Sequence, residues 1–368
     1  MVKEIYLAGA VRTPIGAFSG AFSSVPAAEL GARAVCAVLE RTGLAPDRVE
    51  EVIFGNVLSA GQGQNVARQV AIKAGLPPGT GGVTVNKVCG SGLKSVMLAA
   101  QAIQCGDASI IVAGGTENMS RAPYLLDKAR SGYRLGHGEI IDSVIKDGLW
   151  DVYNDLHMGL LGDRAATKYG FSREDQDDFA VASFTRAQEA VKSGHFKAEI
   201  LPVEVKGRKE TITVSEDEGL QKFNEAKLRG LRPAFGREGT VTAGNASSIN
   251  DGAAAVLVLD EAGLKATGLQ PQARILGYAS YSREPEWFTL APVGAMDRLL
   301  QQLQWKADDV DLWEINEAFS VVPMAAMKDL GISHDKVNVN GGAVALGHPI
   351  GASGTRTLVT LIHALKQS

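Results

Sequence analysis

The chain has 368 residues, of which 45% are hydrophobic and 21% are charged, and its formal net charge is −4. This length provides for at least two domains with a full core, and the composition is that of an ordinary globular protein and not of a fibrous or disordered one. The small negative charge argues against nucleic acid or an anionic membrane as a partner, and we expect neither.

The chain contains three cysteines, Cys36, Cys89 and Cys105. An odd and sparse set favours a reducing compartment and argues against a disulfide framework or a zinc site. No stretch has the length of a secretory h-region or a membrane span, so we predict a cytoplasmic location.

Strands and helices alternate along the first 120 residues. We predict strands at 4–12 and 51–57 and helices at 27–42 and 65–74. Alternation of this kind is typical of a parallel sheet with right-handed crossovers.

Residues 83–119 form the stretch around which the chain is organised, and they predict a strand, a sharp turn, a helix and a second strand. Cys89 stands at the turn, followed by Gly90, Ser91 and Gly92, whose glycines tolerate unusual backbone angles. The N-terminus of the predicted helix would stabilise a thiolate at Cys89. The geometry resembles the nucleophile elbow of hydrolases, with sulfur in place of oxygen. The alternative is a buried structural cysteine, as most free cysteines are.

Residues 121–245 break this rhythm and carry more charge. They contain a predicted helix at 173–193, which Ser172 and Asp175 would open as a capping box. The charged run at 206–210 is typical of a solvated surface. We interpret the region as an insertion between two α/β halves.

The α/β pattern resumes with a buried strand at 253–259. A second cycle follows, with strands predicted at 273–281, 310–315 and 337–339 and helices at 296–304, 317–330 and 355–366. The matching order of elements indicates an internal repeat. We therefore predict an N-terminal half (1–120, completed by 246–268), the insertion (121–245) and a C-terminal half (269–368).

Two halves of this kind place their glycine-rich turns face to face, which brings His348 to Cys89, where an imidazole would take the thiol proton. His157 precedes an apolar run and could line a pocket. Asn316 could hold a water or an oxyanion, or could cap the next helix. The remaining histidines are expected at the surface: His137, His195, His334 and His363.

Several segments spread from end to end carry a family resemblance: AGAVRTPIGAFSGAF, NKVCGSGLKSVMLAAQAI, AGGTENMSRAPYLL, AGNASSINDGAAAVL, EINEAF and NGGAVALGHPIGASG. The chain resembles the thiolases, and most closely their acetyl-CoA acetyltransferase branch. The resemblance implies a five-layered αβαβα fold of two similar βαβαβαββ halves with an inserted loop domain. It also implies a homotetramer built as a dimer of dimers.

The resemblance further implies Claisen condensation of two acetyl-CoA molecules to acetoacetyl-CoA and CoA, or the reverse thiolysis. Cys89 would carry the acyl group, His348 would activate it, and Asn316 would hold a water that stabilises an oxyanion. No metal and no cofactor beyond the coenzyme A thioesters would be needed. The positions that match the family's coenzyme A contacts are Leu149, His157, Phe235, Ala243, Ser247, Ala318 and Phe319.

The chain departs from the family pattern in two places. EPEWFTLAP stands where the family has a glycine-rich segment that places a methionine against the acyl group, and Phe288 or Trp287 would occupy that neighbourhood. A 3-ketoacyl-CoA thiolase of longer chains in β-oxidation is therefore an alternative. The C-terminal half is expected to lack its last two strands, and no cysteine follows Cys105, which makes a catalytically impaired coenzyme A-binding homologue a second alternative. A decarboxylating ketoacyl synthase is disfavoured, because it would place a histidine where Asn316 stands.

Overall fold

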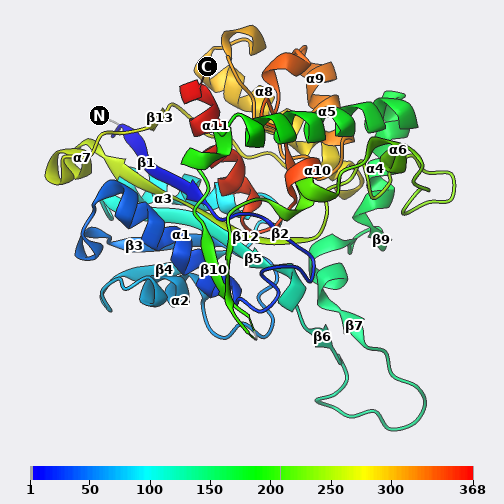
Figure 1. Ribbon diagram of the computed structural model, residues 1–368, viewed down its shortest axis with the longest axis horizontal. Coiled ribbons are helices and arrows are strands. Elements are labelled where there is room, and N and C mark those ends of the chain that lie inside the picture. Colours follow the sequence, from blue (N-terminus) through cyan, green and yellow to red (C-terminus); the bar gives the residue numbers. More distant parts are fainter. Residues whose placement is uncertain (1–2, 208, 368) are drawn as a thin grey trace.

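The computed structural model describes residues 3–207 and 209–367. A seven-stranded sheet lies at its centre in the order β13-β1-β12-β5-β3-β4, and β2 pairs with β12 (Figure 1). The strands are β1 (Ile5–Arg12), β2 (Gly16–Ala17), β3 (Glu51–Gly55), β4 (Gly81–Val85), β5 (Ile110–Asn118), β12 (Asn250–Asp260) and β13 (Ala273–Ile275).

The parallel pairing predicted for the first 120 residues is confirmed for β3, β4 and β5, although the complete sheet is mixed. β3 is parallel to β4 and to β5, as the helical crossovers require. β12 is antiparallel to both β1 and β5, between which it lies. Its direction is set by the path that the chain takes through the insertion, which the local strand–helix alternation does not record.

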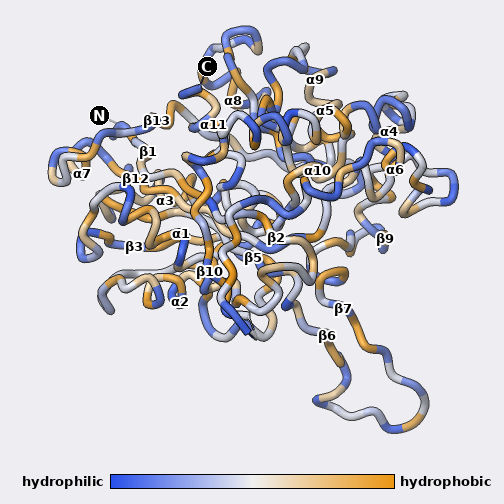
Figure 2. Tube along the Cα trace, in the orientation of Figure 1, coloured by the Kyte–Doolittle hydropathy of each residue, from blue (hydrophilic) through white to orange (hydrophobic). Residues whose placement is uncertain are grey.

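Helices cover both faces of the sheet. α1 (Ala27–Thr42) and α2 (Val66–Lys73) lie on one face, and α3 (Ser91–Cys105) and α11 (Ser353–Gln367) lie on the other. Successive residues of a strand point to opposite faces, so in β12 Leu257 belongs to the core under α1 and Val256 to the core under α3. Because both faces are covered, β5 and β12 are buried along their whole length and are hydrophobic over most of it (Figure 2).

The insertion contains helices and three small hairpins. The predicted capping box is confirmed, since the Ser172 side chain accepts from the Asp175 N–H and the Asp175 carboxylate accepts from the Ser172 N–H. The charged run at 206–210 lies at the turn between β10 and β11, although Arg208 is outside the described residues. The elements are β6 (Tyr124–Leu125), β7 (Ile141–Asp142), β8 (Trp150–Asp151), β9 (Leu156–His157), α4 (Met158–Tyr169), α5 (Arg173–Lys192), β10 (Val203–Lys206), β11 (Thr211–Val214) and α6 (Glu225–Arg229).

The C-terminal half departs most from the predicted elements. β13 is only three residues long and pairs with β1 at the edge of the first sheet. The strands predicted at 310–315 and 337–339 are reduced to one parallel bridge between Trp313 and Val337. Asn338 interrupts the second run with φ +47°, and its side chain donates to the carbonyl of Ile315 and accepts from its N–H, in place of a ladder. The helices beyond β12 are α7 (Glu261–Thr267), α8 (Ala291–Leu303), α9 (Val321–Leu330), α10 (Ala343–Leu346) and α11.

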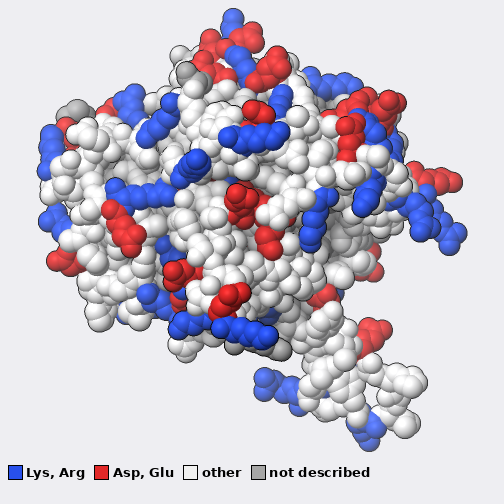
Figure 3. Space-filling view, in the orientation of Figure 1, with Lys and Arg blue, Asp and Glu red and all other residues white. Residues whose placement is uncertain are grey.

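Positive and negative side chains are interspersed over the face seen in Figure 3, without a large area of one sign. The hairpin of β6 and β7 projects from the body of the molecule (Figure 1). Among the described residues, no helix combines the length and the apolar character needed to cross a membrane.

A buried ion cluster joins the insertion to the sheet. Arg12 in β1 is fully buried, and its guanidinium donates to Glu199 at 2.5 Å and to Asp217 at 2.7 and 2.9 Å. These carboxylates raise the pKa of Arg12, although its burial acts in the opposite direction. The cluster therefore fixes two points of the insertion against the end of β1.

Arg12→Ala will destabilise the protein by about 3–5 kcal/mol, because it leaves two buried carboxylates without their cation. Chemical denaturation of the variant and the wild type measures this loss. Lys265→Ala is the control, since Lys265 forms an exposed pair with Glu261 on α7 and should change stability by less than about 0.5 kcal/mol. Equal effects of the two substitutions would show that the buried cluster does not stabilise the fold.

Candidate active site

Cys89 lies on a tight turn between β4 and α3. The residue that takes the strained left-handed backbone conformation is Val88, with φ +48°, and not a glycine as the sequence suggested, since Gly90 has φ −83°. A β-branched residue in this region is an outlier that the surrounding structure must hold in place. Gly92 is needed for close approach, because a Cβ there would lie 2.7 Å from the backbone nitrogen of Thr355 in α11.

His348 lies on the loop between α10 and α11 and is buried, with 5% of its surface exposed. The start of β12 positions it: Ile249 forms a parallel bridge with His348, and the side-chain oxygen of Asn250 accepts from the His348 N–H at 2.9 Å. Gly347 has φ +110° and leaves room for the Asn250 side chain. The turn at the N-terminus of α11 thus faces the turn at the N-terminus of α3.

The two turns bring together the predicted pair. His348 Nε2 lies 3.1 Å from Cys89 Sγ, which confirms the expected contact between residues 259 positions apart. The other ring nitrogen, Nδ1, lies 2.6 Å from the hydroxyl oxygen of Ser353. Apolar side chains enclose the Cys89 side, among them Met119 and Ile350.

The pKa values of the two groups are shifted in opposite directions. Burial raises the pKa of the Cys89 thiol to about 11. Burial, and to a smaller extent the charge of Arg356, lowers the pKa of His348 to about 4. Loss of water around the thiol thus acts against the thiolate that a helix N-terminus stabilises, and it outweighs the backbone hydrogen bond to the sulfur. The geometry is that of a thiol whose proton is taken as it reacts.

The rate at which acetyl-CoA acylates the protein will be nearly independent of pH between about pH 6 and pH 9, because His348 stays an unprotonated base well above its lowered pKa. Because the pKa of His348 is lowered to about 4, the acylation rate should fall only when the pH approaches about 4. Rapid-quench acylation measurements across this range test the prediction. A tenfold fall in rate per pH unit below about pH 6.5, the ordinary pKa of histidine, would contradict it.

Asn316 does not cap the following helix, because Ser320 holds the cap position of α9. Its side-chain oxygen is buried and has no hydrogen-bond partner among the protein atoms. A buried acceptor without a partner is costly unless a water or a ligand group satisfies it. This supports the alternative in which Asn316 holds a water.

The predicted coenzyme A contacts fall into connected groups. His157 stacks on Phe235, with ring centroids 4.6 Å apart, and Phe235 meets Phe319 edge-on at 6.2 Å. Ser247 donates to the carbonyl of Ala318 through its N–H and its hydroxyl, each at 3.0 Å.

Two predicted contact residues lie outside these groups. Leu149 packs against the same apolar cluster as Cys89. Ala243 is exposed. His157 also caps α4, since its Nδ1 accepts from the Gly159 N–H at 3.0 Å. Of the histidines expected at the surface, His363 is buried and contacts the Ala10 carbonyl.

Two contributors to the site were missed from the sequence. Ser353 contacts His348, as described above. The buried carboxylate of Glu117 accepts from the N–H groups of Val57, Leu58 and Gly351, and so ties the His348 loop to β5. Burial raises the pKa of Glu117 to about 7. Ser353 could have been found from the sequence, because it lies in the GASG segment that closely follows His348. Glu117 lies 231 residues before His348, and no sequence pattern connects the two.

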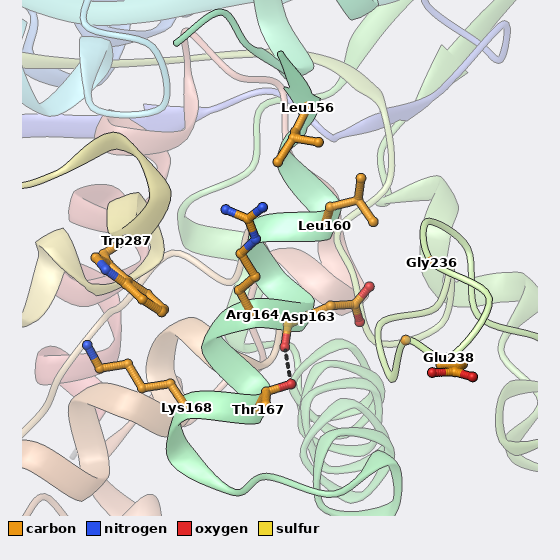
Figure 4. Close-up of a pocket in the computed structure, with 10 residues that line it drawn as sticks. Leu156, Leu160, Asp163, Arg164, Thr167, Lys168, Gly236, Glu238 and Trp287 are labelled. Carbon is orange, nitrogen blue, oxygen red and sulfur yellow. Dashed lines mark hydrogen bonds between the residues drawn. The ribbon is translucent and has the colours of Figure 1, made fainter. Parts of the chain in front are cut away.

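A hollow of about 550 Å³ lies along α4, and its lining includes Leu156 and Gly236, the chain neighbours of His157 and Phe235. Figure 4 shows Arg164 and Lys168 on α4 with Trp287 opposite, and the Lys168 ammonium lies 4.0 Å from the centre of the Trp287 ring. Cys89 does not line this hollow. Trp287 lines this hollow and, like Phe288, packs against the apolar cluster that contains Phe319.

The described residues contain no cluster of three or more histidine, cysteine, aspartate or glutamate side chains suited to hold a metal ion. Cys36 is half-buried, with its sulfur 3.7 Å from the Ala74 carbonyl, and Cys105 is exposed at the far end of α3. Cys89 is thus the one cysteine of the chain that contacts His348.

Two family models match the chain: "Thiolase, N-terminal domain" over residues 5–262 and "Thiolase, C-terminal domain" over residues 269–368. The chain belongs to the thiolase family. It is 51% identical to a protein of Pseudomonas aeruginosa named acetyl-CoA acetyltransferase, over 99% of this chain and 93% of that protein. A Yarrowia lipolytica protein of the same name is also 51% identical, over 100% of this chain and 91% of its own length.

The crystal structure of Acat5 thiolase from Ascaris suum in complex with coenzyme A is similar, with a TM-score of 0.95 and 42% sequence identity. The match covers 98% of this chain and 93% of the Ascaris suum chain. The chain therefore has the thiolase fold over the described residues, including the C-terminal half, where its own strands are short.

Proposed function

We propose that this thiolase transfers an acetyl group between coenzyme A thioesters, condensing two acetyl-CoA molecules to acetoacetyl-CoA and CoA or running the reverse thiolysis. The observation that carries the proposal is the 3.1 Å contact between His348 Nε2 and Cys89 Sγ at a strained turn. A cysteine paired with an imidazole is the arrangement for covalent acyl transfer. Relatives named acetyl-CoA acetyltransferase match this chain over at least 99% of its length, which supports the same reaction for this chain.

In the acylation step, Cys89 Sγ attacks the thioester carbonyl of acetyl-CoA while His348 Nε2 takes the thiol proton. The new bond joins Sγ to the acetyl carbon, and the bond from that carbon to the sulfur of coenzyme A breaks. The imidazolium then returns its proton to the departing CoA thiolate, so charge and protons balance. Asn316, whose buried oxygen has no protein partner, would hold a water at an oxyanion.

Coenzyme A is proposed to lie along Leu149, His157, Phe235, Ser247 and Phe319. Apolar and aromatic side chains of this kind suit the pantetheine arm, and the stacked rings of His157 and Phe235 form one wall. Ala243 and Ala318 would complete the contact. No metal and no resident cofactor enters the proposal.

The acyl-chain preference is proposed to depend on Phe288, which packs against the apolar cluster that also contains Phe319, one of the proposed coenzyme A contacts. A bulky ring beside the acyl group would leave less room for a long chain, which favours the acetyl group over the longer 3-ketoacyl chains of β-oxidation. The purified protein should therefore thiolyse acetoacetyl-CoA with a higher kcat/KM than its longer homologues. A higher kcat/KM for the longer substrates would favour the long-chain thiolase instead, and no thiolysis of either would reject the proposed function.

The assembly is proposed to be a tetramer that uses the β6–β7 hairpin. Large apolar side chains on and beside this projecting segment are exposed: Tyr124 (66%), Leu126 (52%), Leu135 (101%) and Ile140 (68%). Such an exposed set is typical of a protein contact surface. Replacing Leu126 and Ile140 together with aspartate should shift the mass measured by light scattering to that of a smaller species. A wild-type protein that is a stable monomer would contradict the proposal.

A further inference from the structure

Ser353 contacts the ring nitrogen of His348 that faces away from Cys89. It is the first residue of α11 and is 1% exposed. Its hydroxyl oxygen lies 2.6 Å from His348 Nδ1 and 2.9 Å from the carbonyl oxygen of Pro349, to which it donates. Cys89, His348, Ser353 and the Pro349 carbonyl thus form one continuous chain of contacts.

The direction of the hydrogen bonds in this chain decides which nitrogen of His348 can act as a base. A neutral imidazole carries one proton. If the Ser353 hydroxyl donated to Nδ1, the proton would be on Nε2, which would donate to Cys89 Sγ across 3.1 Å. The ring would then have no lone pair facing the thiol, and the thiol hydrogen would have no acceptor within this chain of contacts. If Ser353 donates to Pro349 instead, its oxygen accepts from Nδ1–H, and Nε2 presents a lone pair to the thiol.

Only the second arrangement pairs every donor with an acceptor. The thiol donates to Nε2, Nδ1 donates to Ser353, and Ser353 donates to the Pro349 carbonyl. We propose that Ser353 is a positioning residue that holds His348 in the Nδ1-protonated tautomer, with Nε2 free to take the Cys89 proton. The inference rests on the proposed acyl transfer through Cys89.

The contact between Ser353 and His348 also stabilises the ring after proton transfer. When Nε2 has taken the proton, Nδ1–H still donates to Ser353, so the imidazolium keeps a partner on its buried side. Without that partner, the Nδ1–H would be enclosed without an acceptor, and the ring could turn or exchange tautomers. Removal of the hydroxyl should therefore slow the acylation step more than it weakens substrate binding.

The test compares Ser353→Ala with Thr357→Val. Thr357 lies one turn further along α11, and its buried hydroxyl also bonds to a backbone carbonyl, that of Gly354 at 3.0 Å, without touching His348. We expect Ser353→Ala to lower the rate constant of Cys89 acylation by about 10- to 100-fold with little change in KM, as large as the loss seen when a metal-bound histidine loses the partner that orients its ring. Thr357→Val should stay within about threefold of the wild type, and Ser353→Thr, which keeps the hydroxyl, should recover most of the rate.

Nitrogen NMR of the His348 ring in the wild-type protein tests the tautomer without any substitution. We expect a proton on Nδ1 and none on Nε2 in the resting protein. A proton on Nε2, or an unchanged acylation rate in folded Ser353→Ala, would overturn the inference. A wild-type protein that is never acylated on Cys89 would instead reject the proposed function, so the two failures are distinguishable.

Discussion

Cys89→Ala will abolish thiolysis of acetoacetyl-CoA, with a loss of roughly 10⁵- to 10⁶-fold, the scale found when the nucleophile of a covalent mechanism is removed. The reason is that the acyl group then has no sulfur to which it can transfer. The absorbance of the 3-ketoacyl thioester in the presence of CoA follows the reaction directly. The protein should remain folded, because Cys89 is only half-buried and α3 begins after it.

Cys105→Ala is the matched control for this substitution. Cys105 ends the same helix and is exposed, and it makes no contact with His348. Its removal should leave thiolysis within about twofold of the wild type, because surface substitutions away from a site change little. Equal losses in the two variants would mean that Cys89 is not the acceptor of the acyl group.

His348→Ala will slow acylation of Cys89 by about 10²- to 10⁴-fold, the usual contribution of a positioned general base. The pKa of the Cys89 thiol is raised to about 11, so hardly any thiolate exists at neutral pH without the imidazole to take the proton. Single-turnover acylation with labelled acetyl-CoA isolates this step from the second half-reaction.

His137→Ala controls for loss of a histidine as such, because His137 lies exposed in the segment between β6 and β7. We expect no change in its acylation rate. Retention of the wild-type rate in His348→Ala would show that the close contact between His348 and Cys89 is structural and that another group activates the thiol.

The parts of the fold that depend on local pattern followed from the sequence. The predicted helix at 27–42 coincides with α1, which ends at Gly43 in the left-handed conformation that glycine favours. The helix at 173–193 likewise follows its capping box, and the structure ends it at Lys192. In both cases, a short stretch of chain contains the signals that set the helix start or end.

The parts that depend on distant partners did not follow. The sequence around β12 does not indicate that this strand runs antiparallel between β1 and β5. The direction of β12 depends on how the chain returns from the insertion to the sheet. The extended run at 337–339 has strand-forming residues, but the left-handed Asn338 bonds to Ile315 through its side chain and stops the ladder.

The site divides in the same way. The repeat placed His348 opposite Cys89, since two matching turns face each other in the two halves. The repeat did not indicate that Val88, and not a glycine, takes the left-handed backbone conformation before Cys89. It also did not indicate the raised pKa of Cys89 and the lowered pKa of His348, since both depend on how much water the fold removes from the two groups.

The central claim is that Cys89 carries the acyl group, and peptide mass spectrometry after brief incubation with acetyl-CoA tests it most directly. The protein is quenched in acid, digested and searched for acetylated thiols. We predict one acetyl group, located on the peptide that contains Cys89 and removed when CoA is added before quenching. An acetyl group found on Cys36 or Cys105 instead, or none on Cys89 in a protein that catalyses thiolysis, would contradict the account.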